Sequence, residues 1–193
     1  MINVGKDNNA AYFHEDEYLM IELLPSSEYE KHKDILESEP KIIEDILSLS
    51  EDEINELEKP VRKLEHLKIN KEVFSNSLEN NIPVFEKVQT GYSSYYEYCN
   101  NTIALGSESY RAFIGFNNEG VVENIWIHNS VENEDQVIDA ENLRNYLCSK
   151  FTFICLDWYA KMIFDFSNKA SFYNYMYSSI KRIKDVRKRF DLG

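Results

Sequence analysis

The chain has 193 residues, of which 43% are hydrophobic and 13% aromatic, and its formal net charge is −13. This length and apolar content allow the chain to bury its own core, which excludes intrinsic disorder and a small scaffold dependent on disulfides or metals. The charge is −18 over residues 1–140 and +5 over residues 141–193. The acidic part therefore repels nucleic acid and anionic membranes and attracts basic partners. The alternative explanation of the acidic charge is that it only keeps the protein soluble.

The first 80 residues predict one strand and a series of short helices. The apolar run 18–24 is stopped by Pro25, which favours a strand, and we expect this strand at an edge of the sheet. Residues 28–37 show apolar side chains on one side at helical spacing, and Pro40 suits the start of the next helix. Residues 26–80 as a whole are expected to form short helices with acidic outer faces.

The middle of the chain, residues 82–128, predicts an antiparallel sheet. Its clearest feature is a pair of β-rich runs within residues 110–128, which flank an Asn/Gly turn at 117–120 and are typical of a β-hairpin. Alternate residues of a strand point to opposite faces. On the second strand we therefore expect Ile125 and Ile127 to form the drier face.

Two long helices are predicted after the sheet. An acidic connection over residues 129–139 ends at Asp139, which can cap a helix over 140–165. That helix would be apolar nearly all round and therefore buried. Ser167 can cap a last helix, whose apolar residues recur at helical spacing as far as Phe190.

Together these elements predict an α+β fold in one domain over residues 1–193. A central antiparallel sheet, 82–128, is packed by short N-terminal helices, 26–80, and by two long C-terminal helices within 140–190. No internal repeat and no low-complexity linker divides the chain.

The sequence contains no motif of a known active site or metal site. Its histidines and cysteines lack the spacings of zinc sites and of a disulfide framework, and its 6 glycines form no phosphate-binding loop. Residues 14–17, His-Glu-Asp-Glu, are ligand types, but neighbours on a strand point to opposite faces, so a solvated segment is favoured. We expect no enzyme, no cofactor and no metal; an acid–base pair assembled from distant segments is the alternative.

Two groups of tyrosines and acids are candidates for binding a protein partner. Tyrosine anchors flanked by acids suit the basic surface of a partner. The alternatives are a half-buried strand for the first group and a solvated loop for the second. The candidate residues are Tyr95, Tyr96, Glu97 and Tyr98 in the first group, and Glu132, Glu134 and Asp135 in the second.

The basic segment at residues 181–189 has two interpretations. Its six lysines and arginines suit a nucleic-acid backbone. Cations at the end of a helix are also favourable against the helix dipole, and they can pair with the acidic N-terminal helices of the same chain. We favour this second interpretation because of the strong negative field of residues 1–140.

The sequence indicates a cytoplasmic protein. Residues 1–9 contain no apolar run and so no signal peptide, and no segment approaches the ~18 apolar residues of a membrane span. The cysteine count is odd and no CxxC pair occurs, which fits reduced thiols in a reducing compartment.

The segment Tyr12–Pro25 (YFHEDEYLMIELLP) resembles the opening of bacterial immunity proteins of contact-dependent inhibition and related polymorphic toxin systems. The strand–Asn/Gly–strand segment at 110–128 is similar in character, and the likeness covers about a third of the chain. The resemblance implies a small, acidic, cytoplasmic and non-enzymatic protein that binds one toxin domain and covers or distorts its active site. It transfers no contact residue, because these families bind through different surfaces.

These observations predict an immunity protein that neutralises a cognate basic toxin domain, with a nuclease as the favoured target, and that contacts neither nucleic acid nor a membrane itself. One alternative is an acidic nucleic-acid mimic or adaptor that binds a DNA- or RNA-binding protein. A second alternative is an unrecognised enzyme, which a cleft holding carboxylates or histidines with strongly shifted pKa values would favour.

Overall fold

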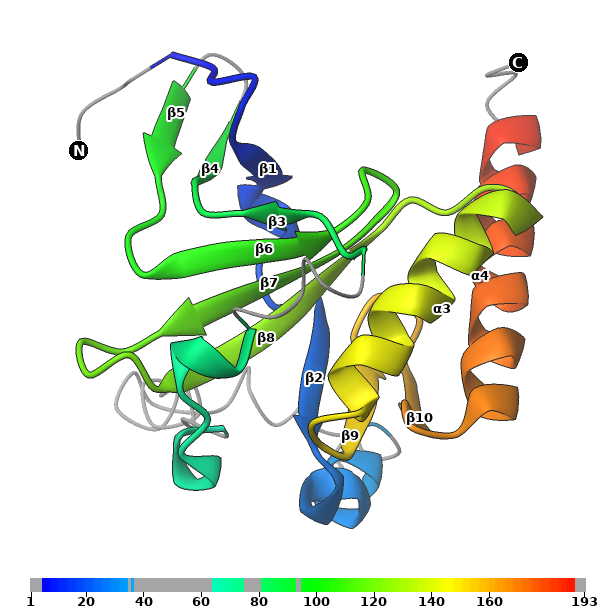
Figure 1. The fold of residues 1–193 in the computed structure, drawn as a ribbon. Helices are drawn as coiled ribbons and strands as arrows, with labels where there is room; N and C mark the ends of the chain where they lie inside the picture. Colours follow the sequence, from blue (N-terminus) through cyan, green and yellow to red (C-terminus); the bar gives the residue numbers. More distant parts are fainter. Residues whose placement is uncertain (1–4, 35, 37–63, 75–80, 93–94, 190–193) are drawn as a thin grey trace, which may run out of the picture.

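The computed structural model describes residues 5–34, 36, 64–74, 81–92 and 95–189. Within these ranges the fold is α+β, as the sequence predicted. A seven-stranded sheet and a three-stranded sheet are accompanied by two long helices (Figure 1).

The seven-stranded sheet has the order β10-β9-β2-β8-β7-β6-β3, and all of its neighbouring strands are antiparallel. The predicted hairpin within 110–128 is confirmed as β7 and β8, and its turn is closed by Asn117. The strands are β2 (Ile21–Pro25), β3 (Val84–Phe85), β6 (Thr102–Gly106), β7 (Tyr110–Phe116), β8 (Val122–Asn129), β9 (Phe153–Asp157) and β10 (Met162–Asp165).

The three-stranded sheet consists of β1 (Ala11–His14), β4 (Val88–Tyr92) and β5 (Tyr95–Tyr98). β1 runs parallel to β4, and β5 is antiparallel to it. A Cβ atom on Gly91 would lie 1.9 Å from the backbone oxygen of Tyr95. Only glycine therefore fits at this position of the β4–β5 hairpin.

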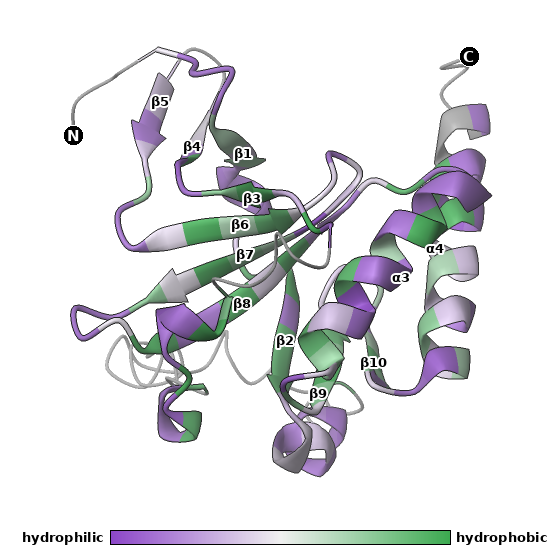
Figure 2. Cartoon of the chain, in the orientation of Figure 1, coloured by the Kyte–Doolittle hydropathy of each residue, from purple (hydrophilic) through white to green (hydrophobic). Residues whose placement is uncertain are grey.

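The two faces of the seven-stranded sheet bury different cores. On one face, the helices α3 (Glu134–Cys148) and α4 (Lys169–Arg189) pack on the larger core, which contains Ile125 and Ile127 as predicted. On the other face, Phe13 of β1 packs against Trp126 of β8 in a second core that joins the small sheet to the large one. Figure 2 shows hydrophobic residues concentrated in the strands of the large sheet.

The predicted helix over 140–165 is wrong in its second half. Helix α3 begins at Glu134, with Asn133 rather than Asp139 as its cap, and ends at Cys148. The following apolar segment forms β9 and β10. Burial of β9 on both faces explains the error, because an apolar run without alternation is typical of a buried strand as well as of a buried helix.

The start of the last helix is also shifted from the prediction. Asn168, not Ser167, caps α4, since its side chain accepts a hydrogen bond from the backbone N–H of Ser171. The predicted apolar stripe of this helix is confirmed at Phe172, Met176 and Ile180, which are all buried.

The expected edge position of the 18–24 strand is wrong. This strand is β2, and it lies between β9 and β8 in the interior of the large sheet. The prediction of a single sheet over 82–128 is also wrong, since β4 and β5 form a separate sheet with β1. A single sequence does not show which strands pair when their partners are 70 or more residues away.

Shorter elements connect the strands. They include the 3-10 turns η1 (Glu15–Glu17), η2 (Ser26–Glu28) and η3 (Glu65–Leu67), and residues 29–34 are helical, as predicted for 28–37. The other predicted helices between 37 and 63 lie outside the described residues. In the described ranges, no helix combines the length and apolar character needed to cross a membrane.

Candidate functional site

The tyrosine group predicted to bind a partner lies together on β5. Three of its residues are half-buried, and Tyr98 is exposed. The Tyr95 hydroxyl donates to the Glu97 carboxylate at 2.7 Å, and the Tyr98 hydroxyl donates to Asp7 at 2.8 Å. The hydrogen bond to Glu97 raises the pKa of Tyr95 to about 12. Both tyrosines are therefore fixed by acids of their own chain.

The second predicted group lies at the other end of the molecule, around the start of α3 (Figure 1). Glu134 and Asp135 are in the first helical turn, where carboxylates are stabilised by the helix dipole. The backbone N–H of Glu132 donates to the side chain of Gln136 at 2.7 Å. The structure does not bring this group together with the tyrosines of β5.

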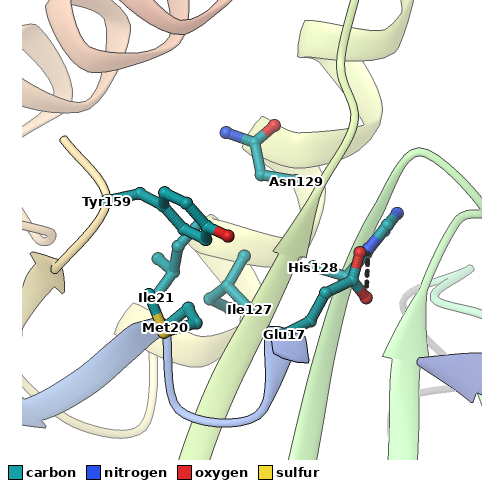
Figure 3. Close-up of a pocket in the computed structure, with 7 residues that line it drawn as sticks. All are labelled: Glu17, Met20, Ile21, Ile127, His128, Asn129 and Tyr159. Carbon is teal, nitrogen blue, oxygen red and sulfur yellow. Dashed lines mark hydrogen bonds and ion pairs between the residues drawn. The ribbon is translucent and has the colours of Figure 1, made fainter. Parts of the chain in front are cut away.

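A cleft that the sequence did not predict opens where β2 begins and β8 ends (Figure 3). It encloses about 170 Å³. The backbone N–H of Trp158 donates to the Met20 carbonyl at 3.0 Å and holds the β9–β10 turn beside the cleft. The lining residues are Glu17, Met20, Ile21, Ile127, His128, Asn129 and Tyr159.

A row of hydrogen bonds runs along one side of this cleft. His128 Nδ1 lies 3.1 Å from Glu17 Oε2, and His128 Nε2 lies 3.1 Å from Ser130 Oγ. The same Glu17 oxygen accepts a hydrogen bond from the backbone N–H of His14 at 3.2 Å. Burial alone would raise the pKa of Glu17. The hydrogen bond and charge of His128, together with the N–H of His14, have a larger opposite effect, so the pKa is lowered overall. Glu17 is therefore a carboxylate at neutral pH.

The order Ser130–His128–Glu17 matches the order of groups in a serine hydrolase, but the two backbone N–H groups nearest to the Ser130 hydroxyl are both engaged. The backbone N–H of Ser130 donates to the Ser109 carbonyl, and that of Val131 donates to the Asn129 side chain. Neither N–H is available to stabilise an oxyanion, which is a large part of such catalysis. The Ser130 hydroxyl also lies 3.3 Å from the Ser109 carbonyl.

A second polar network connects Asn129, which lines the cleft, to α4. Asn129 donates through Nδ2 to Ser179 at 3.3 Å and to the Tyr175 hydroxyl at 3.5 Å. Tyr175 in turn donates to Asp157, a carboxylate only 1% exposed, at 2.9 Å. Arg182 of α4 pairs with the same Asp157 oxygen at 3.4 Å. The cleft wall is thus tied to α4 through buried polar groups.

The cleft and the β4–β5 hairpin are joined through η1. The ring of His14 contacts that of Tyr92 at 4.8 Å, and its backbone N–H binds Glu17. The negative charge of Glu15 also contributes to the raised pKa of Tyr95. We refer to these adjoining residues as the acidic–aromatic surface. It comprises Glu15, Asp16, Glu17, Tyr92, Tyr95 and Tyr159.

Other features of the described residues have structural roles. Lys169 at the start of α4 pairs with Glu141, and Arg182 of the basic segment pairs with Asp157 of β9. The predicted pairing of this segment with the acidic N-terminal helices stays a prediction, because most of those helices lie outside the described residues. The three cysteines are free, and burial raises the pKa of Cys99 to about 11. Across the described residues, no group of three or more His, Cys, Asp or Glu side chains could hold a metal ion.

Comparison of the chain with protein-family models, with curated proteins and with solved structures found no match. Sequence reasoning missed the pairing of Glu17 with His128, because the two residues are 111 positions apart. The only local signal was the His-Glu-Asp-Glu run at 14–17, which has the residue types of a site but no partner nearby in the sequence.

Proposed function

We propose that this protein is a non-enzymatic, cytoplasmic binding protein that neutralises a basic protein domain, as immunity proteins of bacterial toxin systems do. The observation that supports this function best is the acidic–aromatic surface. It combines the exposed acids Glu15 and Asp16 with the tyrosines Tyr92 and Tyr159, which are 59% and 73% exposed.

The composition of this surface suits recognition of a cationic protein. A net charge of −13 attracts such a partner over long distances and raises the association rate. Tyrosine side chains are frequent binding hot spots, because they bury a large area at low entropic cost. A nuclease is the favoured target, since an enzyme that grips phosphates must itself be basic.

The surface is also held rigidly, which reduces the entropic cost of binding. Phe13, one residue before His14, is buried against Phe113 and Trp126 with ring centroids 5.0 Å and 5.2 Å away. Gly91 fixes the β4–β5 hairpin that carries Tyr92. Tyr92 and Tyr95 are thus presented on strands, whereas the acids of η1 and Tyr159 lie on short turns next to the packed sheets.

The proposal is tested by capturing partners from cell extract with the full chain as bait and identifying them by mass spectrometry. Each captured protein is then purified, and its own activity is assayed with and without the bait. We expect one basic protein that binds tightly and loses its activity. Binding of several unrelated DNA-binding proteins would instead favour a nucleic-acid mimic, and the absence of any basic partner would contradict the proposal.

Charge reversal locates the binding surface once the partner is in hand. The double variant Glu15→Lys/Asp16→Lys is compared with Glu134→Lys/Asp135→Lys at the start of α3, which changes the net charge equally. We expect the first variant to slow association several-fold at low salt and the difference to vanish at high salt. If only the α3 variant slows association, the partner binds at the α3 end and our choice of surface is wrong.

A further inference from the structure

We propose that the cleft between β2 and β8 accepts one lysine or arginine side chain of the protein partner. This inference rests on the proposed function and adds the chemical identity of the group that enters the cleft. It is argued from the free oxygen of Glu17, from the apolar floor, from the exposed ring of Tyr159 and from the size of the cleft.

Glu17 offers one carboxylate oxygen to a ligand. Its Oε2 atom accepts hydrogen bonds from the backbone N–H of His14 and from His128, which fix the orientation of the carboxylate. Its Oε1 atom has no hydrogen-bond partner among the described residues. A positioned carboxylate with a free oxygen is a strong acceptor for an ammonium or guanidinium group.

The floor of the cleft is apolar. Met20, Ile21 and Ile127 line it, and Ile127 is buried beneath the surface. Lysine and arginine carry a methylene stem below their charged end, and such stems commonly lie along apolar surface. Methionine adapts its shape to the group that it contacts. A cationic side chain would therefore match both the floor and the carboxylate at the rim.

Tyr159 supplies an aromatic wall. It is 73% exposed on the β9–β10 turn, and Figure 3 shows its ring beside the opening with Glu17 and His128 across from it. A tyrosine ring attracts a cation placed over its face. An anionic ligand would instead be repelled by Glu17, and a neutral aromatic ring would leave the Oε1 atom of Glu17 without a hydrogen bond.

The size of the cleft limits the ligand to one side chain. Its volume is about 170 Å³, whereas a cavity of about 150 Å³ holds a single benzene molecule. Most pockets for drug-sized molecules begin at about 300 Å³. The end of one long side chain fits this space, and a nucleotide does not.

The experiment uses side-chain mimics, so that it does not require the partner. The free protein is titrated with n-butylguanidinium and, as a neutral probe of the same shape, n-butylurea, while NMR signals of Tyr159 and His128 are followed. We expect the guanidinium to bind with a dissociation constant in the millimolar range and the urea to bind at least about fivefold more weakly.

Two variants and one control make the test specific. Glu17→Gln should weaken guanidinium binding about fivefold or more, and Tyr159→Ala, an exposed change that leaves the core intact, should weaken it about two- to fivefold. Tyr177→Ala, which removes a tyrosine that is 50% exposed on α4, should have no effect. Equal binding of the urea, or unchanged binding in both cleft variants, overturns the inference.

The experiments distinguish failure of this inference from failure of the proposed function. If the probes do not bind but a basic partner is captured and inhibited, the cleft assignment fails and the proposed function stands. If guanidinium binds as expected but no basic partner exists, the proposed function fails, and the cleft remains a cation site without its proposed protein occupant.

Discussion

The buried network behind the cleft allows a sharp test of the fold, through the single substitution Tyr175→Phe. This change removes one hydroxyl and leaves the ring in place. Tyr175 is 1% exposed, and burial holds its pKa well above the usual value, so its hydroxyl is a permanent donor. The hydroxyl donates to the buried Asp157 and accepts a hydrogen bond from Asn129.

The expected cost follows from these two contacts. A hydrogen bond to a charged group contributes about 1.5–3 kcal/mol, and removing one partner leaves a buried group less satisfied. Asp157 keeps the backbone N–H of Ala160 at 2.8 Å and Arg182 at 3.4 Å, so the loss should fall within this range rather than above it. For a chain of this size, each kcal/mol lowers the melting temperature by about 2–4 °C.

The measurement is urea unfolding followed by circular dichroism, with Tyr177→Phe as a matched control. Tyr177 lies on the same helix, and its hydroxyl has no hydrogen-bond partner among the described residues. Its substitution should change the free energy of unfolding by less than about 0.5 kcal/mol. If Tyr175→Phe is as stable as the control, the Asn129–Tyr175–Asp157 network does not hold α4 to the sheet.

Three further predictions concern the support of the acidic–aromatic surface. Because the pKa of Glu17 is lowered in the folded state, its pairing stabilises the protein above the unfolded pKa and is lost as the pH falls through the folded value. Glu17→Gln should therefore reduce stability at pH 7, and this loss should shrink as the pH falls through the lowered folded pKa; a loss that does not change with pH would contradict this pairing. Phe13→Ala should cost about 3–5 kcal/mol and release the small sheet, seen as a change in Trp126 fluorescence; an unchanged spectrum would show that β1 does not pack there. Gly91→Ala should destabilise the β4–β5 hairpin, measured as faster amide exchange of Tyr95, and unaltered exchange would show that the hairpin tolerates a Cβ atom.

Local patterns were sufficient to predict the parts of the fold in which neighbouring residues interact. The β7–β8 hairpin follows from two β-rich runs around an Asn/Gly turn, and its drier face contains Ile125 and Ile127 as expected. The stripe of α4 is another such case, because residues four apart in a helix share one face. In each case, the interacting groups lie close together along the chain.

Continuous apolar runs were the main source of error. The segment over 149–165 was predicted to continue a helix, but it forms β9 and β10. The prediction failed because β9 is buried on both faces, and such a strand lacks the alternation that identifies a strand in sequence. The same burial conceals the interior position of β2. Such segments take their structure from the strands beside them rather than from their own pattern.

By itself, the sequence determined the α+β class, the acidic charge, the central hairpin and the presence of a tyrosine-rich strand at β5. Only the tertiary structure decided the order of the strands, the separate small sheet and the cleft where Glu17 meets His128. These features depend on contacts between segments far apart along the chain: His128 lies 111 residues from Glu17, and Trp158, which follows β9, lies 136 residues from Glu22 of β2. Composition and periodicity describe the preferences of each segment, whereas such contacts arise from packing one segment on another.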